Sequence, residues 1–127
     1  AHDPRGSALF ADLGCATCHV GSFVVSSDPG VTGRPIERIA PFTDLLLHDV
    51  GPELAEAVDL GDGLSAEWRT APLWGLRYRP ALLHDGRASR PDEAVLWHGG
   101  EAERSRDRFL DLSAADRDAL LTFLARL

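Results

Sequence analysis

Several features are missing from this 127-residue chain, and each absence removes a class of protein or site. There is no methionine, so a methionine sulfur cannot ligate any metal that the chain binds. Only two cysteines are present, which excludes a zinc site made of two cysteine pairs. No run of large apolar residues is longer than that at Leu45–Leu47, whereas a transmembrane helix needs about 20 residues. The formal net charge of −7 argues against nucleic-acid binding, which requires a basic surface.

The two cysteines lie in one pentapeptide, Cys15-Ala-Thr-Cys18-His19. Two thiols three positions apart, followed directly by an imidazole, form the attachment signal for a c-type haem. We expect Cys15 and Cys18 to bond to the two vinyl groups along one porphyrin edge, and His19 to ligate the iron from the proximal side. The alternatives are half a zinc site or two buried thiols beside a coincidental histidine, but no second ligand pair follows at matching spacing. The motif therefore predicts one covalently bound haem c.

Length and composition predict a single domain over residues 1–127, with 44% hydrophobic residues, as in ordinary globular proteins. The chain starts at Ala1 rather than methionine, so we expect a processed chain or an excised piece. Haem c is attached on the outer side of energy-transducing membranes. We therefore expect a periplasmic or otherwise extracytoplasmic location, with no membrane span in this chain.

Helical signals recur along the chain, without convincing strand alternation or an internal repeat. Four helices are expected, over residues 7–13, 51–61, 91–99 and 113–127, with Ser7 and Ser113 as N-caps and Pro91 in a first turn. Glycine and proline between residues 20 and 43 predict a long loop, and residues 68–74 a short helix or turn. The sequence thus predicts an all-α, cytochrome c-like fold of short helices and long loops around the haem.

A second axial ligand would have to be another residue or water, because methionine is absent. Of the remaining histidines, we set His2 aside because a terminus frays. His98 is best placed, because on its expected helix it shares a face with Ala94 and Val95. His48 and His84 precede Asp-Val-Gly and Asp-Gly sequences and stay open as alternatives.

Four other residues are candidates for contact with the porphyrin. Arg34 and Arg38 lie in the expected loop and would pair with propionates, although exposed arginines are the default. Trp74 and Trp97 would pack on the ring or carry electrons, or else fill the core.

Several phrases from residue 44 onward resemble a known family. Residues 67–127 resemble the C-terminal haem domain of the bacterial di-haem cytochrome c peroxidase and MauG-type superfamily. The matching phrases are Arg-Thr-Ala-Pro-Leu-Trp-Gly-Leu (69–76), Leu-His-Asp-Gly (83–86) and Glu-Ala-Val (93–95). The phrases at 44–51 and 94–102 are closer still to the di-haem oxidoreductase branch, labelled thiol oxidoreductases.

The resemblance implies a specific second ligand. In the peroxidases, the electron-transferring haem takes its second ligand, a methionine, from the helix after the His-Asp-Gly loop, and that position falls on His98 here. The resemblance therefore implies ligation by His19 and His98. It also implies two haems, each with its own motif, whereas this chain has one.

These observations predict a one-haem c-type cytochrome domain for electron transfer, with no catalytic residue of its own. The alternative is the electron-input domain of a di-haem peroxidase-like oxidoreductase whose catalytic haem lies in another domain or subunit. Whether the chain is an enzyme by itself stays open. In both cases the expected partner is a redox protein or a second haem domain, with no nucleic acid and no membrane span in this chain.

Overall fold

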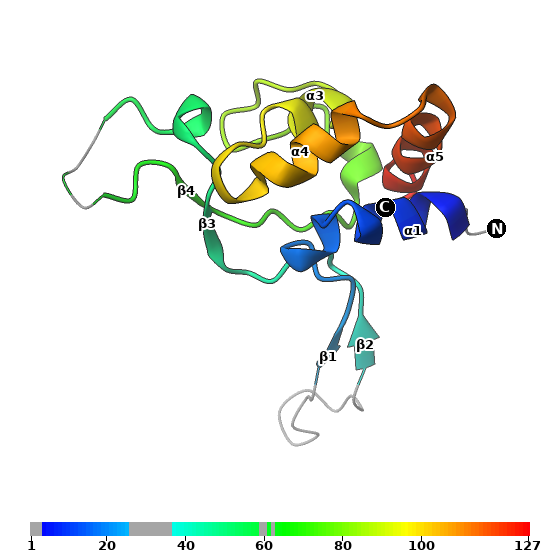
Figure 1. Ribbon diagram of the computed structural model, residues 1–127. Helices are drawn as coiled ribbons and strands as arrows, with labels where there is room; N and C mark the ends of the chain where they lie inside the picture. Colours follow the sequence, from blue (N-terminus) through cyan, green and yellow to red (C-terminus); the bar gives the residue numbers. More distant parts are fainter. Residues whose placement is uncertain (1–3, 26–36, 59–60, 62) are drawn as a thin grey trace, which may run out of the picture.

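Two helices from opposite ends of the chain lie side by side and supply most of the hydrophobic core. The structure, a computed structural model, describes residues 4–25, 37–58, 61 and 63–127. Helix α1 (Pro4–Asp12) packs against α5 (Ala114–Leu124), as Figure 1 shows. A Cβ on Gly6 of α1 would lie only 2.3 Å from the carbonyl oxygen of Ala119, so the two helices touch backbone to backbone. The apolar stripes of both helices meet in one core, made of Leu9, Phe10, Leu13, Leu76, Phe109, Leu120, Phe123 and Leu124.

The N-terminal boundaries of these helices test the predicted caps. Ser113 caps α5 as predicted, because its hydroxyl accepts a hydrogen bond from the Asp116 N–H at 3.2 Å. The Ser7 cap is wrong, because α1 already begins at Pro4. Proline suits the first turn of a helix, since its φ is preset and the missing N–H has no partner there.

The region after Pro91 contains two helices rather than one. Helix α3 (Pro91–Leu96) starts with its proline, as predicted, and has two acidic residues in its first turn, but it ends before Gly99. A 3-10 turn, η4 (Gly100–Ala102), then leads into α4 (Glu103–Leu110). The sequence reading missed α4 because most of its residues are charged. Phe109, only 2% exposed, anchors this helix to the core.

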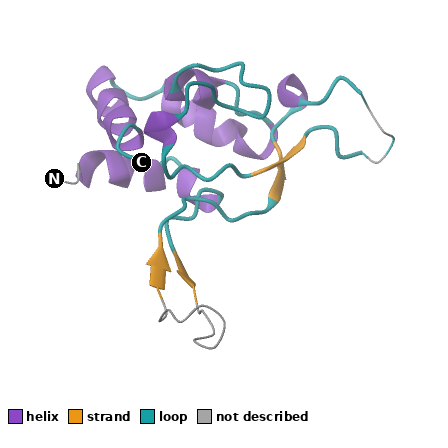
Figure 2. Ribbon diagram, turned by 180° about the vertical axis from the view of Figure 1, so that it is seen from behind, coloured by secondary structure: helices purple, strands orange, loops and turns teal. Residues whose placement is uncertain are grey.

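The prediction of an all-α fold is wrong, because the structure contains two small antiparallel sheets (Figure 2). β1 (Phe23–Val25) pairs with β2 (Glu37–Ile39) inside the predicted loop, and this hairpin projects from the body. β3 (Leu47–Asp49) pairs with β4 (Glu67–Arg69), which places His48 opposite Trp68. Three-residue strands are too short to show an alternating pattern, so only their pairing defines them.

The predicted helix at 51–61 is also wrong. Only a 3-10 turn, η2 (Pro52–Leu54), forms there, and part of the range lies outside the described residues. The range 68–74, predicted as a short helix or turn, begins inside β4. Residues 70–75 then connect β4 to a further 3-10 turn, η3 (Leu76–Tyr78). Within the described residues, no helix has the length and apolar character needed to span a membrane.

Candidate functional site

The cysteine motif lies in a 3-10 turn directly after α1. Gly14 takes a left-handed conformation (φ 92°) and opens η1 (Cys15–Thr17), and the His19 N–H then donates to the Cys15 carbonyl at 2.9 Å. Both thiols are free. Burial raises the pKa of the Cys15 thiol to about 11, and burial together with the Asp44 and Glu101 carboxylates raises that of Cys18. Both thiols are therefore protonated at neutral pH, unlike a thiolate nucleophile.

His19 is held by the segment that follows the β1–β2 hairpin. Its Nδ1–H donates to the Phe42 carbonyl at 3.1 Å, so in the neutral ring Nε2 carries the lone pair. Burial lowers the pKa of His19, which favours the neutral form. The Phe10 ring lies beside the His19 ring, with centroids 6.3 Å apart, and both residues line a cavity of about 280 Å³ together with Phe42 and Phe123.

The Phe42 carbonyl, which accepts the His19 Nδ1–H, belongs to a strained backbone segment. Phe42 has a φ of 56° and Leu45 a φ of 63°, both in the region that favours glycine. Buried Thr43 stabilises this segment: its hydroxyl donates to the Thr70 carbonyl at 2.7 Å and accepts from the Leu45 N–H at 3.0 Å. A strained backbone conformation is kept only where many surrounding contacts hold it, and such conformations are often found at functional sites.

His98 follows α3 and has the same arrangement as His19. Its Nδ1–H donates to the Ala94 carbonyl at 2.7 Å, which again leaves the lone pair on Nε2. Burial lowers the pKa of His98, and the proximity of His98 contributes to the lowered pKa of His19. The structure thus places two neutral imidazoles, from segments that are 79 positions apart in the sequence (98 minus 19), within electrostatic range of each other.

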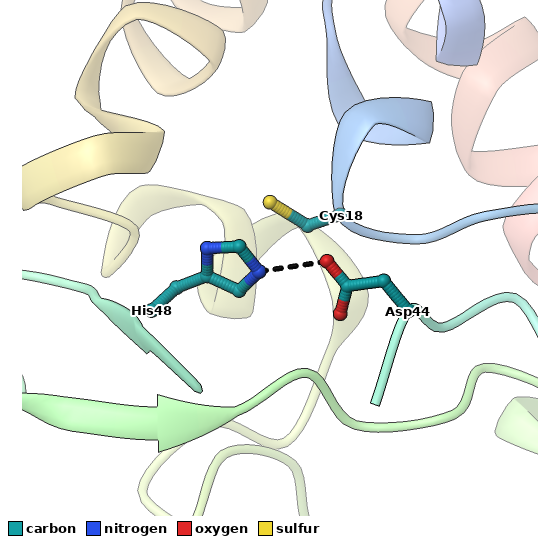
Figure 3. A group of neighbouring side chains, drawn as sticks. All are labelled: Cys18, Asp44 and His48. Carbon is teal, nitrogen blue, oxygen red and sulfur yellow. Dashed lines mark hydrogen bonds and ion pairs between the residues drawn. The ribbon is translucent and has the colours of Figure 1, made fainter. Parts of the chain in front are cut away.

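His48 lies close to the motif but is differently engaged (Figure 3). Its Nε2 contacts Asp44 Oδ2 at 2.7 Å and its Nδ1 contacts Glu101 Oε2 at 2.9 Å. The bond to Glu101, and then the bond to Asp44, raises the pKa of His48. Burial opposes ionisation of Asp44, but bonds from the Leu46 N–H and His48 hold the pKa of its carboxyl at about 2. Protonated His48 is therefore an ion-pair partner, with no nitrogen lone pair for a metal.

The same place contains a set of potential metal ligands. Among the described residues, a ligand atom from each of Cys18, Asp44 and His48 lies within 4.8 Å of the other two. Figure 3 shows the Cys18 sulfur above the ion pair. A cation would have to displace the proton on His48, and it would compete with the predicted attachment of a porphyrin to Cys18.

His84 does not join the other histidines. It lies in the turn closed by the Gly86 N–H and the Leu83 carbonyl, and its exposed ring stacks on Trp68 with centroids 3.6 Å apart. Trp68 in turn donates its Nε1–H to the Leu54 carbonyl at 2.8 Å. This stacking gives His84 a packing role on β4.

Of the four residues predicted to contact the porphyrin, the structure describes three. Arg34 lies outside the described residues, and exposed Arg38 donates to the Ser22 hydroxyl within the projecting hairpin. Trp74 is 50% exposed and Trp97 37%, so neither fills the core.

A residue that the sequence reading missed, Arg87, lies against Trp97. Its guanidinium is 4.7 Å from the Trp97 ring centroid, contacts Asp85 at 2.6 Å and donates to the Glu53 carbonyl at 2.6 Å. Arg87 thereby ties the turn after His84 to the end of α3. A cation directly after a His-Asp-Gly turn carries no signal of this contact in the sequence.

Two glycine-containing segments, residues 49–51 and 99–100, pack against each other beside His98. The Gly99 N–H donates to the Val50 carbonyl at 3.0 Å. A Cβ on Gly100 would lie 2.4 Å from the Asp49 carbonyl oxygen, and one on Gly51 would lie 3.0 Å from the Gly100 nitrogen. The backbones of residues 49–51 and 99–100 therefore pack directly against each other, and this packing fixes the segment that follows His98.

The family comparison covers this whole arrangement. The model of the family described as "Di-haem oxidoreductase, putative peroxidase" matches residues 1–127. The chain belongs to this di-haem oxidoreductase family. It is therefore a haem-binding, oxidoreductase-type domain, as the resemblance implied. No curated protein sequence and no solved structure matches the chain.

The donor set of this di-haem oxidoreductase domain fits a haem iron. Neutral imidazoles with Nδ1–H bound to a carbonyl are the form in which histidine ligates iron through Nε2. Exposed apolar side chains also lie near the attachment turn: Leu45, Leu46 and Leu47 directly follow Asp44 and are 59%, 59% and 52% exposed. A porphyrin is a large apolar plate, and covering such side chains would be favourable.

Proposed function

We propose that this domain is a one-haem c-type cytochrome domain that transfers electrons. Cys15 and Cys18 would hold the porphyrin covalently, and His19 and His98 would be its axial ligands. When bound, the haem supplies a one-electron ferric/ferrous couple. The observation that carries the proposal is the matching state of His19 and His98, two partly buried neutral imidazoles that each donate Nδ1–H to a carbonyl and keep a lone pair on Nε2.

The other histidines support this assignment by their contacts. His48 has both ring nitrogens on carboxylates, and His84 stacks on Trp68 at the surface. Two imidazole ligands leave no open position for peroxide, which suits electron transfer. They also place the reduction potential below that of a histidine/methionine cytochrome. Covalent attachment of haem c takes place outside the cytoplasm, so we propose a periplasmic or equivalent location.

Two measurements on the matured protein test the proposal. The intact mass should exceed that of the polypeptide by one haem, and the ferric spectrum should be low spin without a methionine-to-iron charge-transfer band. His98→Ala should convert the iron to high spin, whereas the matched variant His84→Ala should leave it low spin. A His98→Ala protein that stays low spin would overturn the ligand assignment, and an unmodified mass would overturn the covalent haem.

A second candidate is favoured by the family itself. Its description names two haems, whereas this chain contains one attachment motif. The domain would then pass electrons to a catalytic haem in another domain or subunit. We expect the isolated domain to leave hydrogen peroxide unreacted. We also expect a second haem protein to co-purify with it from its native source if this candidate holds. Rapid reaction of the isolated domain with peroxide would contradict both candidates.

A further inference from the structure

His48 joins two segments of the chain through a carboxylate–imidazole–carboxylate bridge. Its ring lies on β3 and is about one-fifth exposed, with a side-chain exposure of 19%. Asp44 and Glu101 contact its two nitrogens at 2.7 and 2.9 Å. Without a cation between them, these two carboxylates would repel each other, so the positive charge of His48 holds them together.

One end of the bridge fixes the segment after His98. Glu101 lies three residues beyond His98, and its second carboxylate oxygen accepts the Asp49 N–H at 3.1 Å. The Gly99 N–H also binds the Val50 carbonyl, so side-chain and backbone bonds attach residues 99–101 to the end of β3. The position of His98 therefore depends on this attachment.

The other end fixes the segment that holds His19. Asp44 follows Phe42 by two residues, and the Phe42 carbonyl accepts the His19 N–H. Thr43, between them, is 1% exposed and bonded to the Thr70 carbonyl, so Asp44 starts from a rigid point. The bridge therefore runs from the support of one imidazole to the support of the other.

We infer that His48 is a positioning residue, which holds the segment carrying His98 to the segment that supports His19, so that His98 would stay in place as the second ligand. This inference rests on the proposed function. It assigns to His48 an indirect role through Glu101 and Asp44, with no contact to the iron. Each of its two bonds to a carboxylate is charge-assisted, and bonds of this kind are worth more than neutral ones.

Carbon monoxide binding to the ferrous protein measures how firmly His98 is held, because His98 must leave before carbon monoxide can bind. His48→Gln keeps the approximate size of the side chain but loses the positive charge and one of the two bonds to a carboxylate. We expect carbon monoxide to bind about tenfold faster in His48→Gln than in the wild type. Asp116→Asn is the control, because it removes the ion pair to Arg5 between α1 and α5, remote from the bridge. This control should bind carbon monoxide at the wild-type rate.

Two further variants separate positioning from general packing. His48→Arg restores a cation between the carboxylates and should return the rate toward that of the wild type. Glu101→Gln should accelerate binding as His48→Gln does, and the double variant should be no faster than either single one. Glu101→Gln also tests the bridge if His48→Gln fails to fold.

The outcomes distinguish this inference from the proposed function. A low-spin wild type whose binding rate is unchanged in His48→Gln and Glu101→Gln would overturn the positioning role alone. Additive effects of the two substitutions, or equal acceleration in Asp116→Asn, would also overturn it. A wild type that is high spin, or that binds carbon monoxide without any ligand dissociation, would instead overturn the axial assignment.

Discussion

Gly100→Ala is the substitution for which the structure gives the clearest cost. Gly100 has a φ of 52°, in the left-handed region, and the new Cβ would lie 2.4 Å from the Asp49 oxygen and 2.8 Å from the Gly51 nitrogen. The left-handed conformation costs alanine about 1 kcal/mol. Since both neighbours are backbone atoms, they must move as well, which adds about 2 kcal/mol. We expect the free energy of unfolding to fall by about 3 kcal/mol in total.

Gly75→Ala is the matched control for this prediction. Gly75 has a φ of 73°, and its Cβ would meet no atom within 4 Å. This substitution should therefore cost only the conformational part, about 1 kcal/mol. Urea unfolding of the two haem-loaded variants, analysed with a shared m-value, measures the difference. Equal costs for Gly100→Ala and Gly75→Ala would refute the close packing of residues 49–51 against residues 99–100.

Three further changes test other parts of the molecule. Gly6→Ala should lower the free energy of unfolding by roughly 2–3 kcal/mol, because its Cβ would meet the Ala119 carbonyl across the α1–α5 contact, and an unchanged urea midpoint would contradict that contact. Ser113→Ala removes the hydrogen bond to the Asp116 N–H and should cost about 1 kcal/mol, visible as a lower Tm. Acidification should convert the ferric protein from low to high spin. Burial lowers the pKa of His98, so the ring is neutral at pH 7, and protons compete for Nε2 only as the pH falls below the ordinary value of 6.5. A low-spin spectrum that persists until the protein unfolds would argue against His98 as the ligand.

Local chemistry explains which elements could be predicted. The cap at Ser113 and the start of α3 at Pro91 each depend on a few adjacent residues, and the structure confirms both. The strands could not be predicted in this way, because the pairing of Leu47–Asp49 with Glu67–Arg69 joins distant segments. Helix α4 was missed because Phe109 alone anchors a charged segment to the core.

The sequence by itself determined the family and the attachment motif, because Cys15, Cys18 and His19 are neighbours whose spacing carries their chemistry. It also excluded methionine as a ligand, since composition does not depend on folding. Only the tertiary structure decided which histidine keeps a lone pair on Nε2 and which is held by carboxylates. The sequence favoured His98 and left His48 open, and the difference in their bonding arises from contacts between segments that folding brings together.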